Sequence, residues 1–169
     1  MEVYELVKTI GGGNFGQVYL AKHRLEGKYY VLKKVKTRDM SDRDRENTEN
    51  EVRLLQKLRH TNIVGYKDSF LDREQFLNIV MVHCEGGDIY TRTKSAKGKC
   101  FTEDQILEWF VQIVLALHYL HERRILHRDL KTQNIFLKDG RVFLPPFTRI
   151  DSSWRFRHCK GSGQYPRLC

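Results

Sequence analysis

The spacing of apolar residues changes along this chain, and the change limits which folds are open to it. From Tyr4 to Val35 apolar and polar residues alternate, with glycine-containing turns between the alternating runs, which predicts three antiparallel strands. From Ser41 to Leu58 the apolar residues recur at helical spacing instead, and Ser41 or Asp42 can cap this helix. Residues 65–70 and 76–82 predict two more strands. The first half therefore predicts a small antiparallel sheet with one helix.

The second half of the chain turns helical after Gly86-Gly87. Thr102 and the two acidic residues that follow it predict a helix start, and the apolar residues after them recur at steps of three and four as far as His121. We expect one long amphipathic helix, buried over much of its surface. Residues 143–169 show neither period and are expected to form a divergent tail without regular structure. The apolar side of the long helix comprises Ile106, Phe110, Ile113, Leu117 and Leu120.

The charge of the chain is strongly basic, with a formal net charge of +9 over 169 residues. Such a balance raises nucleic acid as a partner. The basic residues are spread among acids, however, and form no block interleaved with aromatic residues, so a solvated basic surface explains the charge better. Nucleic-acid binding would rest on charge alone, and we expect no such partner.

The cysteines and the hydropathy pattern indicate a soluble intracellular protein. Cys84, Cys100, Cys159 and Cys169 show no CxxC spacing and no pairing with histidines that suggests zinc, so reduced thiols are expected. The N-terminus has no apolar signal segment, and no run approaches the ~20 apolar residues that cross a bilayer. We expect no membrane association, and the oligomeric state is left open.

The polar segment from His127 to Asn134 carries the residues best suited to chemistry. It sets a carboxylate at Asp129, cations at Arg128 and Lys131, and an amide at Asn134 close together in sequence. This set can orient a hydroxyl proton, neutralise a phosphoryl group and hold a metal ion. A solvated charged loop is the alternative for the segment taken alone.

A glycine pattern, G-x-G-x-x-G-x-V, runs from Gly11 to Val18 between two predicted strands. Its place in a hairpin separates it from the strand-to-helix turn of a dinucleotide site. Glycines let a backbone approach phosphates closely, and Phe15 at the tip could cover them. A plain tight turn is the alternative for this pattern.

A lysine and a glutamate upstream can complete a phosphate site. Lys33 lies at the end of the third predicted strand, and Glu51 lies on the predicted helix where its carboxylate could pair with the ammonium. The alternative is two surface charges, because Lys34 and Lys36 are equally basic neighbours.

The hairpin, lysine, glutamate and His-Arg-Asp segment, in this order, resemble a eukaryotic protein kinase. Over residues 4–142 the chain resembles more narrowly the NIMA-related (Nek) serine/threonine kinases. The resemblance implies an α+β kinase-like fold with a complete small lobe (residues 1–82) and the start of the helical large lobe (83–142). The segments that carry it are 84–90 (CEGGDIY), 108–113 (EWFVQI) and 125–137 (ILHRDLKTQNIFL).

What the resemblance implies for chemistry is transfer of the ATP γ-phosphoryl group to serine or threonine hydroxyls of protein substrates. Asp129, Lys131, Lys33 and Glu51 would be the catalytic residues, and Asn134 would hold Mg²⁺. A cytoplasmic, nuclear, centrosomal or ciliary location would follow. The implied ATP-binding residues are Ile10, Gly11, Gly12, Gly13, Asn14, Phe15, Gly16, Gln17, Val18, Val31, Lys33, Met81 (as gatekeeper), Val82, His83, Cys84 and Asp88.

The sequence departs from the kinase pattern after Asn134. The second magnesium ligand, the aspartate of Asp-Phe-Gly, is absent, because Pro145-Pro146-Phe147 occupies that place and Asp151 is not followed by Phe-Gly. A complete kinase domain also needs roughly 250 residues. We therefore expect weak or no activity and hypothesise, as the alternative function, a non-catalytic module that binds nucleotide or competes for partners.

The codons of the tail suggest an origin for this departure. The codons that can encode Trp154 to Pro166 can also be read in a frame that starts one base later. In that frame they are compatible with the peptide Gly-Asp-Phe-Gly-Ile-Ala-Arg-Val-Leu-Asp-Asn-Thr, which contains the missing Asp-Phe-Gly motif. A frame error or an altered splice is the hypothesis, and a genuine isoform is the alternative.

Overall fold

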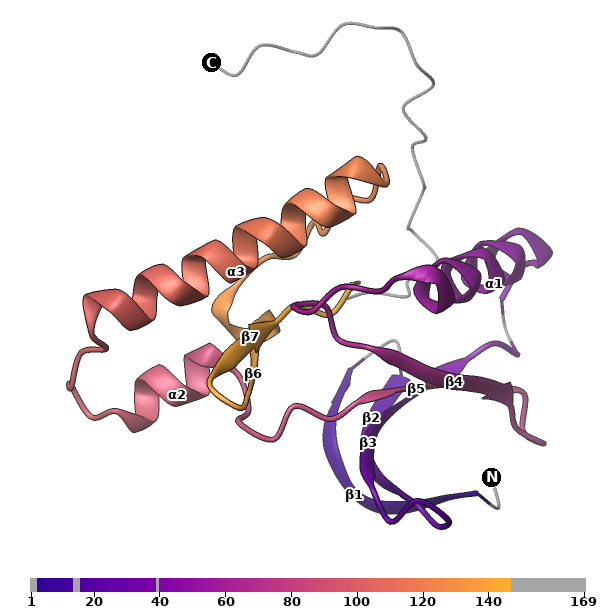
Figure 1. Ribbon diagram of the computed structural model, residues 1–169. Helices are drawn as coiled ribbons and strands as arrows, with labels where there is room; N and C mark the ends of the chain where they lie inside the picture. The colour runs from indigo at the N-terminus through magenta and orange to yellow at the C-terminus, as the bar shows by residue number, and fades with distance from the viewer. Residues whose placement is uncertain (1–2, 14–15, 39, 147–169) are drawn as a thin grey trace, which may run out of the picture.

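The first half of the molecule is an antiparallel sheet, as the alternating pattern predicts (Figure 1). The computed structural model describes residues 3–13, 16–38 and 40–146. The apolar strand β5 lies between β3 and β4 in the order β1-β2-β3-β5-β4, and its Ile79 and Val80 are buried. The five strands are β1 (Tyr4–Gly13), β2 (Gly16–His23), β3 (Tyr29–Lys36), β4 (Tyr66–Leu71) and β5 (Phe76–Val82).

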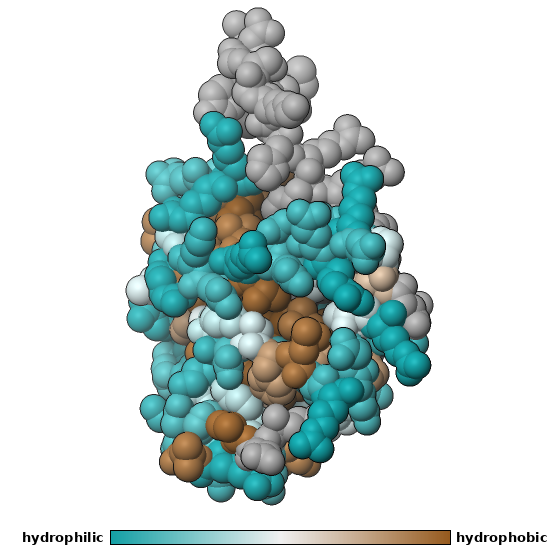
Figure 2. All heavy atoms as spheres, turned by 90° about the vertical axis from the view of Figure 1, so that its right-hand side faces the viewer, coloured by the Kyte–Doolittle hydropathy of each residue, from teal (hydrophilic) through white to brown (hydrophobic). Residues whose placement is uncertain are grey.

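Helix α1 (Asp42–Lys57) follows the third strand, within two residues of its predicted bounds. Ser41 is its N-cap, and the Ser41 hydroxyl accepts a hydrogen bond of 3.2 Å from the backbone N–H of Asp44. Its buried residues, Thr48, Glu51, Val52 and Leu55, recur at steps of three, one and three and so lie on one face. The side of the molecule where α1 and the end of β4 lie is mostly hydrophilic, with hydrophobic side chains gathered in its middle (Figure 2).

The start of the large lobe contains short elements that periodicity did not predict. Helix α2 has no buried residue, so it lacks an amphipathic pattern, and the two strands of the small hairpin have only three residues each. The elements are α2 (Ile89–Ser95), α3 (Glu103–Glu122), the 3₁₀ turn η1 (Thr132–Asn134), β6 (Phe136–Lys138) and β7 (Arg141–Phe143).

Helix α3 begins and ends within a residue of the prediction, with Thr102 as its N-cap, but its buried face is different. The expected apolar side is wrong at Ile106 and Phe110, which are 51% and 61% exposed. The buried residues are Trp109, Gln112, Ala116 and Leu120. The helix is apolar on two sides, and only one of them faces the β6–β7 hairpin and the segment before β4. Part of the apolar surface of α3 is therefore left uncovered by the described residues.

The expected absence of structure from residue 143 onward is wrong at its first residues. Phe143 ends β7 and pairs with Phe136, and Leu144 is fully buried in a parallel bridge to Ile63. Pro145 and Pro146 are buried as well. Backbone partners on a distant segment hold these residues, which local periodicity cannot reveal. The rest of the expected tail, including Asp151 and residues 154–166, lies outside the described residues.

One hydrophobic core joins the sheet, α1, α3 and the β6–β7 hairpin. Its members come from both halves of the chain, among them Val35, Leu55, Ile79, Leu120 and Val142. A second, smaller cluster around Tyr4, Leu32 and Val80 fills the other side of the sheet. Within the described ranges, no helix is both long and apolar enough to cross a membrane.

Candidate active site

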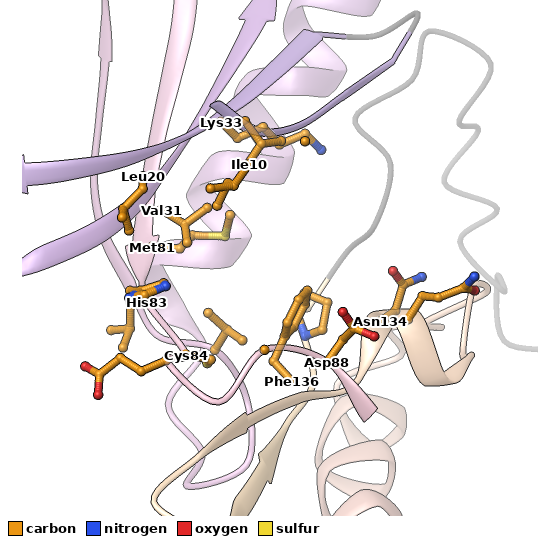
Figure 3. A pocket seen from close by; sticks show the side chains of 18 of the residues that line it. Ile10, Leu20, Val31, Lys33, Met81, His83, Cys84, Asp88, Asn134 and Phe136 are labelled. Atoms are coloured by element: carbon orange, nitrogen blue, oxygen red, sulfur yellow. The ribbon is translucent and has the colours of Figure 1, made fainter. Parts of the chain in front are cut away.

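A cleft of about 660 Å³ lies between the sheet and the start of the large lobe. Figure 3 shows Ile10 and Lys33 on its sheet side, and Asp88, Asn134 and Phe136 on the opposite side. The walls come from β1, β2, β3, the residues after β5, η1, β6 and the segment after β7. Segments far apart in sequence therefore meet around one cavity.

Most of the residues expected to bind a nucleotide line this cleft. Gly12, Gly16 and Gln17 are not in its wall, Gly13 pairs with Gly16 across the hairpin, and Asn14 and Phe15 lie outside the described residues. The expected residues that line the cleft are Ile10, Gly11, Val18, Val31, Lys33, Met81, Val82, His83, Cys84, Asp88 and Asn134.

Several lining residues were not predicted. Leu20 could have been found, because it follows Val18 by two residues and so lies on the same face of β2. Lys8 stands in the same relation to Ile10 on β1, although the ladder has irregularities there. Only the tertiary structure brings the others into the wall, and these are Val64, Glu85, Gly87, Gln133, Phe136 and Pro145.

Gly16 is the residue of the glycine hairpin that most clearly requires glycine. Its φ of +143° lies in a region that L residues rarely adopt, and a Cβ there would be 2.1 Å from the carbonyl oxygen of Lys34. At Gly12 the nearest atom to such a Cβ would be 3.6 Å away, an ordinary contact. The hairpin therefore packs its backbone directly against β3, the strand that carries Lys33.

Lys33 projects from β3 into the cleft, opposite Val18 on β2 and Ile79 on β5 in the ladders. Burial lowers the pKa of its ammonium, and the negative charge of Glu51 partly offsets the shift. The cleft thus holds a cation that is largely removed from water, a position that favours an anionic ligand.

Glu51 is 4% exposed on α1, and its Oε1 has no hydrogen-bond partner among the described residues. Burial raises the pKa of this carboxyl to about 7, and the charge of Lys33 acts in the opposite direction. The expected pairing of Lys33 and Glu51 is therefore present as an electrostatic interaction, with no hydrogen bond at Oε1. Neither group is an ordinary surface charge, which was the alternative for this pair.

The polar segment brings Asp129, Lys131 and Asn134 together. The Asn134 side-chain amide donates to Oδ2 and to the backbone oxygen of Asp129, both at 2.9 Å. Lys131 Nζ lies 3.1 Å from the same Oδ2. Arg128, directly before Asp129, has a φ of +59°, a conformation that costs a non-glycine residue about 1–2 kcal/mol and that is common at functional sites. The hydrogen bonds and the ion pair at Asp129 hold the segment in one arrangement, which argues against the alternative of a solvated charged loop.

The connection after β5 leaves a backbone donor free at the cleft. Within the described residues, the N–H of Cys84 has no acceptor, whereas the N–H groups of Val82 and Gly86 donate to Gly65 and Leu137. Cys84 is buried, and burial raises the pKa of its thiol to about 11, so it is a neutral group. Apolar side chains from β2, β3 and β6 flank this donor in the wall.

The residues around Asn134 do not fit a magnesium site. Mg²⁺ in proteins is usually bound through one or two carboxylates together with substrate phosphates. Asp88 caps α2, with its two oxygens accepting from the N–H and hydroxyl of Thr91, and Asp129 is engaged as described. The wall next to Asn134 includes Pro145, which has no side-chain ligand. No cluster of three or more potential metal ligands occurs in the described part of the chain.

Comparison with known proteins places these observations in a family. The protein kinase domain family matches residues 4–147. The chain is 52% identical to serine/threonine-protein kinase Nek4 of Mus musculus over 79% of its length, 47% identical to Nek1 of Mus musculus over 100%, and 47% identical to Nek5 of Homo sapiens over 84%. It spans only 17%, 14% and 20% of the lengths of these relatives.

Proposed function

Since this chain belongs to the protein kinase family and is of the NIMA-related (Nek) type, we propose that it binds ATP in the cleft as part of a serine/threonine protein kinase. The observation that carries the proposal is the pair of groups at the two ends of one cavity. A free backbone donor at Cys84 stands at one end, and the partly buried ammonium of Lys33 stands at the other.

The Cys84 end suits a purine base. A flat, mainly apolar slot with one or two backbone hydrogen-bonding groups is the usual form of a small-molecule site. Val31 and Leu20 supply apolar wall from the sheet, and Phe136 supplies it from the large lobe (Figure 3). The N–H of Cys84 would donate to a ring nitrogen of the base, which would satisfy a group that has no protein acceptor in the described residues.

The Lys33 end suits the phosphates. An ammonium held away from water is costly without a counter-charge, and a phosphate supplies one more directly than Glu51 does. The glycine hairpin lies against the same strand, so its backbone can approach a phosphate chain without a side chain in between. A bound phosphate would therefore offset the cost of keeping the Lys33 ammonium away from water.

Asp129 is the residue that would act on the acceptor substrate. Its carboxylate, at 34% side-chain exposure, is open to a serine or threonine hydroxyl of a protein, whose proton it would orient and accept. Lys131, 3.1 Å away, would hold negative charge beside that hydroxyl. Because the residues next to Asn134 do not complete a metal site, we propose that phosphoryl transfer by this chain is weak or absent.

A non-catalytic nucleotide-binding module is the second candidate. Two observations favour it, namely Pro145 in the wall of the cleft that Asn134 also lines and the absence of a hydrogen bond at Oε1 of Glu51 within the described residues. In this case the cleft would bind nucleotide, and the chain would act through partners of related kinases.

Binding and transfer can be tested separately on the purified chain. A fluorescent ATP analogue should bind, and Lys33→Met should weaken it at least tenfold, or about 1.4 kcal/mol. The matched control is Lys57→Met, an exposed lysine in the last turn of α1, which should bind as the unchanged chain does.

Transfer of labelled phosphate to a serine/threonine peptide decides between the two candidates. Activity that Asp129→Asn removes supports the kinase, whereas binding without transfer supports the non-catalytic module. A chain that binds no nucleotide contradicts both.

A further inference from the structure

We propose that this chain binds nucleotide without a divalent cation, so that the ammonium of Lys33 replaces the ion as the counter-charge of the phosphates. The inference rests on the proposed function, because it concerns how the same cleft holds its ligand. It differs from what the resemblance to kinases implies, namely a magnesium ion at Asn134, and the difference follows from the donor groups that this chain presents.

The segment after β7 that lines the cleft is held in place, and within the described residues it contributes no side-chain oxygen to the wall. Leu144 donates its N–H to Asn62 across 2.9 Å, and its carbonyl oxygen accepts the N–H of Val64 across 2.8 Å. These two bonds fix the backbone directly before Pro145, which lines the cleft, and Pro146, which is buried. Proline has neither a side-chain ligand for a hard cation nor a backbone N–H for a phosphate.

The carboxylates that line or border the cleft are committed elsewhere. Both oxygens of Asp88 accept hydrogen bonds at 2.8 Å in the first turn of α2. Glu85, on the connection after β5, pairs with Lys138 at 3.9 Å. Asp129 shares Oδ2 between the amide of Asn134 and Lys131. Among the described residues that line the cleft, the side-chain oxygens near η1 that have no hydrogen-bond partner are the amide oxygens of Gln133 and Asn134, and neither is the carboxylate through which Mg²⁺ is usually bound.

The positive charge of Lys33 can take over the task of the ion. The Lys33 ammonium is partly buried in the cleft, and burial lowers its pKa. Coulombic attraction between a partly desolvated ammonium and a phosphate is stronger than in water, because the surroundings screen less. A magnesium ion bound to the nucleotide would lower the negative charge that Lys33 meets and would find no free carboxylate in the described wall in return.

The test compares the affinity of the complete 169-residue chain for a fluorescent ATP analogue in excess Mg²⁺ and in EDTA. We expect the two dissociation constants to agree within about threefold, which is less than 1 kcal/mol. Binding that Mg²⁺ tightens by about tenfold or more overturns the proposal. If this tightening disappears in Asp151→Asn, the missing ligand comes from outside the described residues, and the proposal is overturned with its cause identified.

A gain of metal dependence provides a second, independent arm. Pro145→Asp places a carboxylate in the wall of the cleft that Asn134 also lines and should make Mg²⁺ tighten binding, whereas Pro145→Asn, similar in size and uncharged, should not. Circular dichroism first shows that both variants are folded. If Mg²⁺ then changes the nucleotide affinity of both variants equally, the inference that a missing carboxylate prevents Mg²⁺ binding is overturned. If the unchanged chain binds no ATP analogue either in Mg²⁺ or in EDTA, the result contradicts the proposed function instead.

Discussion

The side-chain amide of Asn62 donates a hydrogen bond of 2.9 Å to Oε1 of Gln112, linking the segment before β4 to the middle of α3. The same Asn62 nitrogen donates to the carbonyl oxygen of Val142, and Gln112 Oε1 also accepts the N–H of Val142, both at 2.9 Å. Asn62 and Gln112 are 3% and 8% exposed. The segment before β4, helix α3 and strand β7 are thus joined by one buried polar network.

This network should be costly to break. Asn62→Ala and Gln112→Ala each leave buried partners without hydrogen bonds and should lower the free energy of unfolding by about 2–3 kcal/mol. The double variant should lose less than the sum, because the two residues share one bond. Denaturant titration measures all three. Gln56→Ala, which removes a surface bond to Tyr66, is the control and should cost under about 1 kcal/mol. Additive losses would show that the bond between Asn62 and Gln112 contributes nothing.

Glu51 should make stability depend on pH near neutrality. Burial raises its pKa from 4.5 to about 7, with Lys33 as the charge that opposes the shift. A carboxyl whose pKa is higher in the folded chain stabilises the fold fully at pH values below its pKa in the unfolded chain. This contribution is lost as the pH rises through its pKa in the folded chain. Between about pH 5 and pH 8 the chain should lose up to about 3 kcal/mol relative to Glu51→Gln.

Urea titrations of both proteins across this pH range measure the difference. Glu49→Gln, an exposed glutamate on the same helix, is the control and should track the unchanged chain. A stability difference between the chain and Glu51→Gln that stays constant with pH would mean that Glu51 keeps the same charge throughout.

Gly16 and Gly12 should respond differently to the same substitution. Gly16→Ala forces a Cβ to within 2.1 Å of the Lys34 carbonyl oxygen at a φ of +143°, so the hairpin must move away from β3. We expect a loss of at least about 1–2 kcal/mol in stability and weaker binding of the ATP analogue. Gly12→Ala adds a methyl group at ordinary contact distance and should be tolerated. Thermal unfolding and nucleotide titration of both variants test this, and equal effects would contradict the hairpin geometry.

The uncovered side of α3 should bind apolar probes. It presents Ile106, Leu107, Phe110, Val111, Val114 and Leu115, each 45–61% exposed. The double variant Phe110→Glu/Val114→Lys replaces two of them by an i,i+4 ion pair and should reduce binding of an apolar dye such as ANS. Stability should change by no more than about 0.5 kcal/mol.

The neighbouring Trp109 is the matched contrast on the same helix. It is buried and donates a hydrogen bond of 3.0 Å to the carbonyl oxygen of Gly140, so Trp109→Ala should cost about 3–5 kcal/mol. Strong destabilisation by the Phe110→Glu/Val114→Lys pair would show instead that this side of α3 is packed in solution.

Local sequence patterns were sufficient to predict the larger helices and strands and the residues suited to chemistry. The alternation in β1 to β3, the run of apolar residues in β5, and the caps at Ser41 and Thr102 are properties of neighbouring residues, and the structure follows them closely. The order of the glycine hairpin, Lys33, Glu51 and the segment around Asp129 likewise indicated a kinase before any tertiary information, and the family match agrees.

What depends on distant partners was missed or predicted wrongly. The buried face of α3 was misplaced because an apolar residue is buried only where another element covers it, and Phe110 has none in the described part of the chain. Leu144 to Pro146 were assigned to a tail, since nothing in their composition shows that the backbone of Asn62 and Val64 would bind them. Val64, Phe136 and Pro145 enter the wall of the cleft for the same reason.

The sequence by itself determined the types of element, their order and the groups available for chemistry, because these depend on residue type and spacing within a few turns. Only the tertiary structure decided that the carboxyl of Glu51 is buried, with no hydrogen bond at Oε1 from the described residues, and that Pro145 lines the same cleft as Asn134. Burial, distance and dielectric surroundings arise from contacts between residues far apart in the chain. The charge of a carboxylate and the ligands of a metal ion are set by these contacts and not by the residue's own neighbours in sequence.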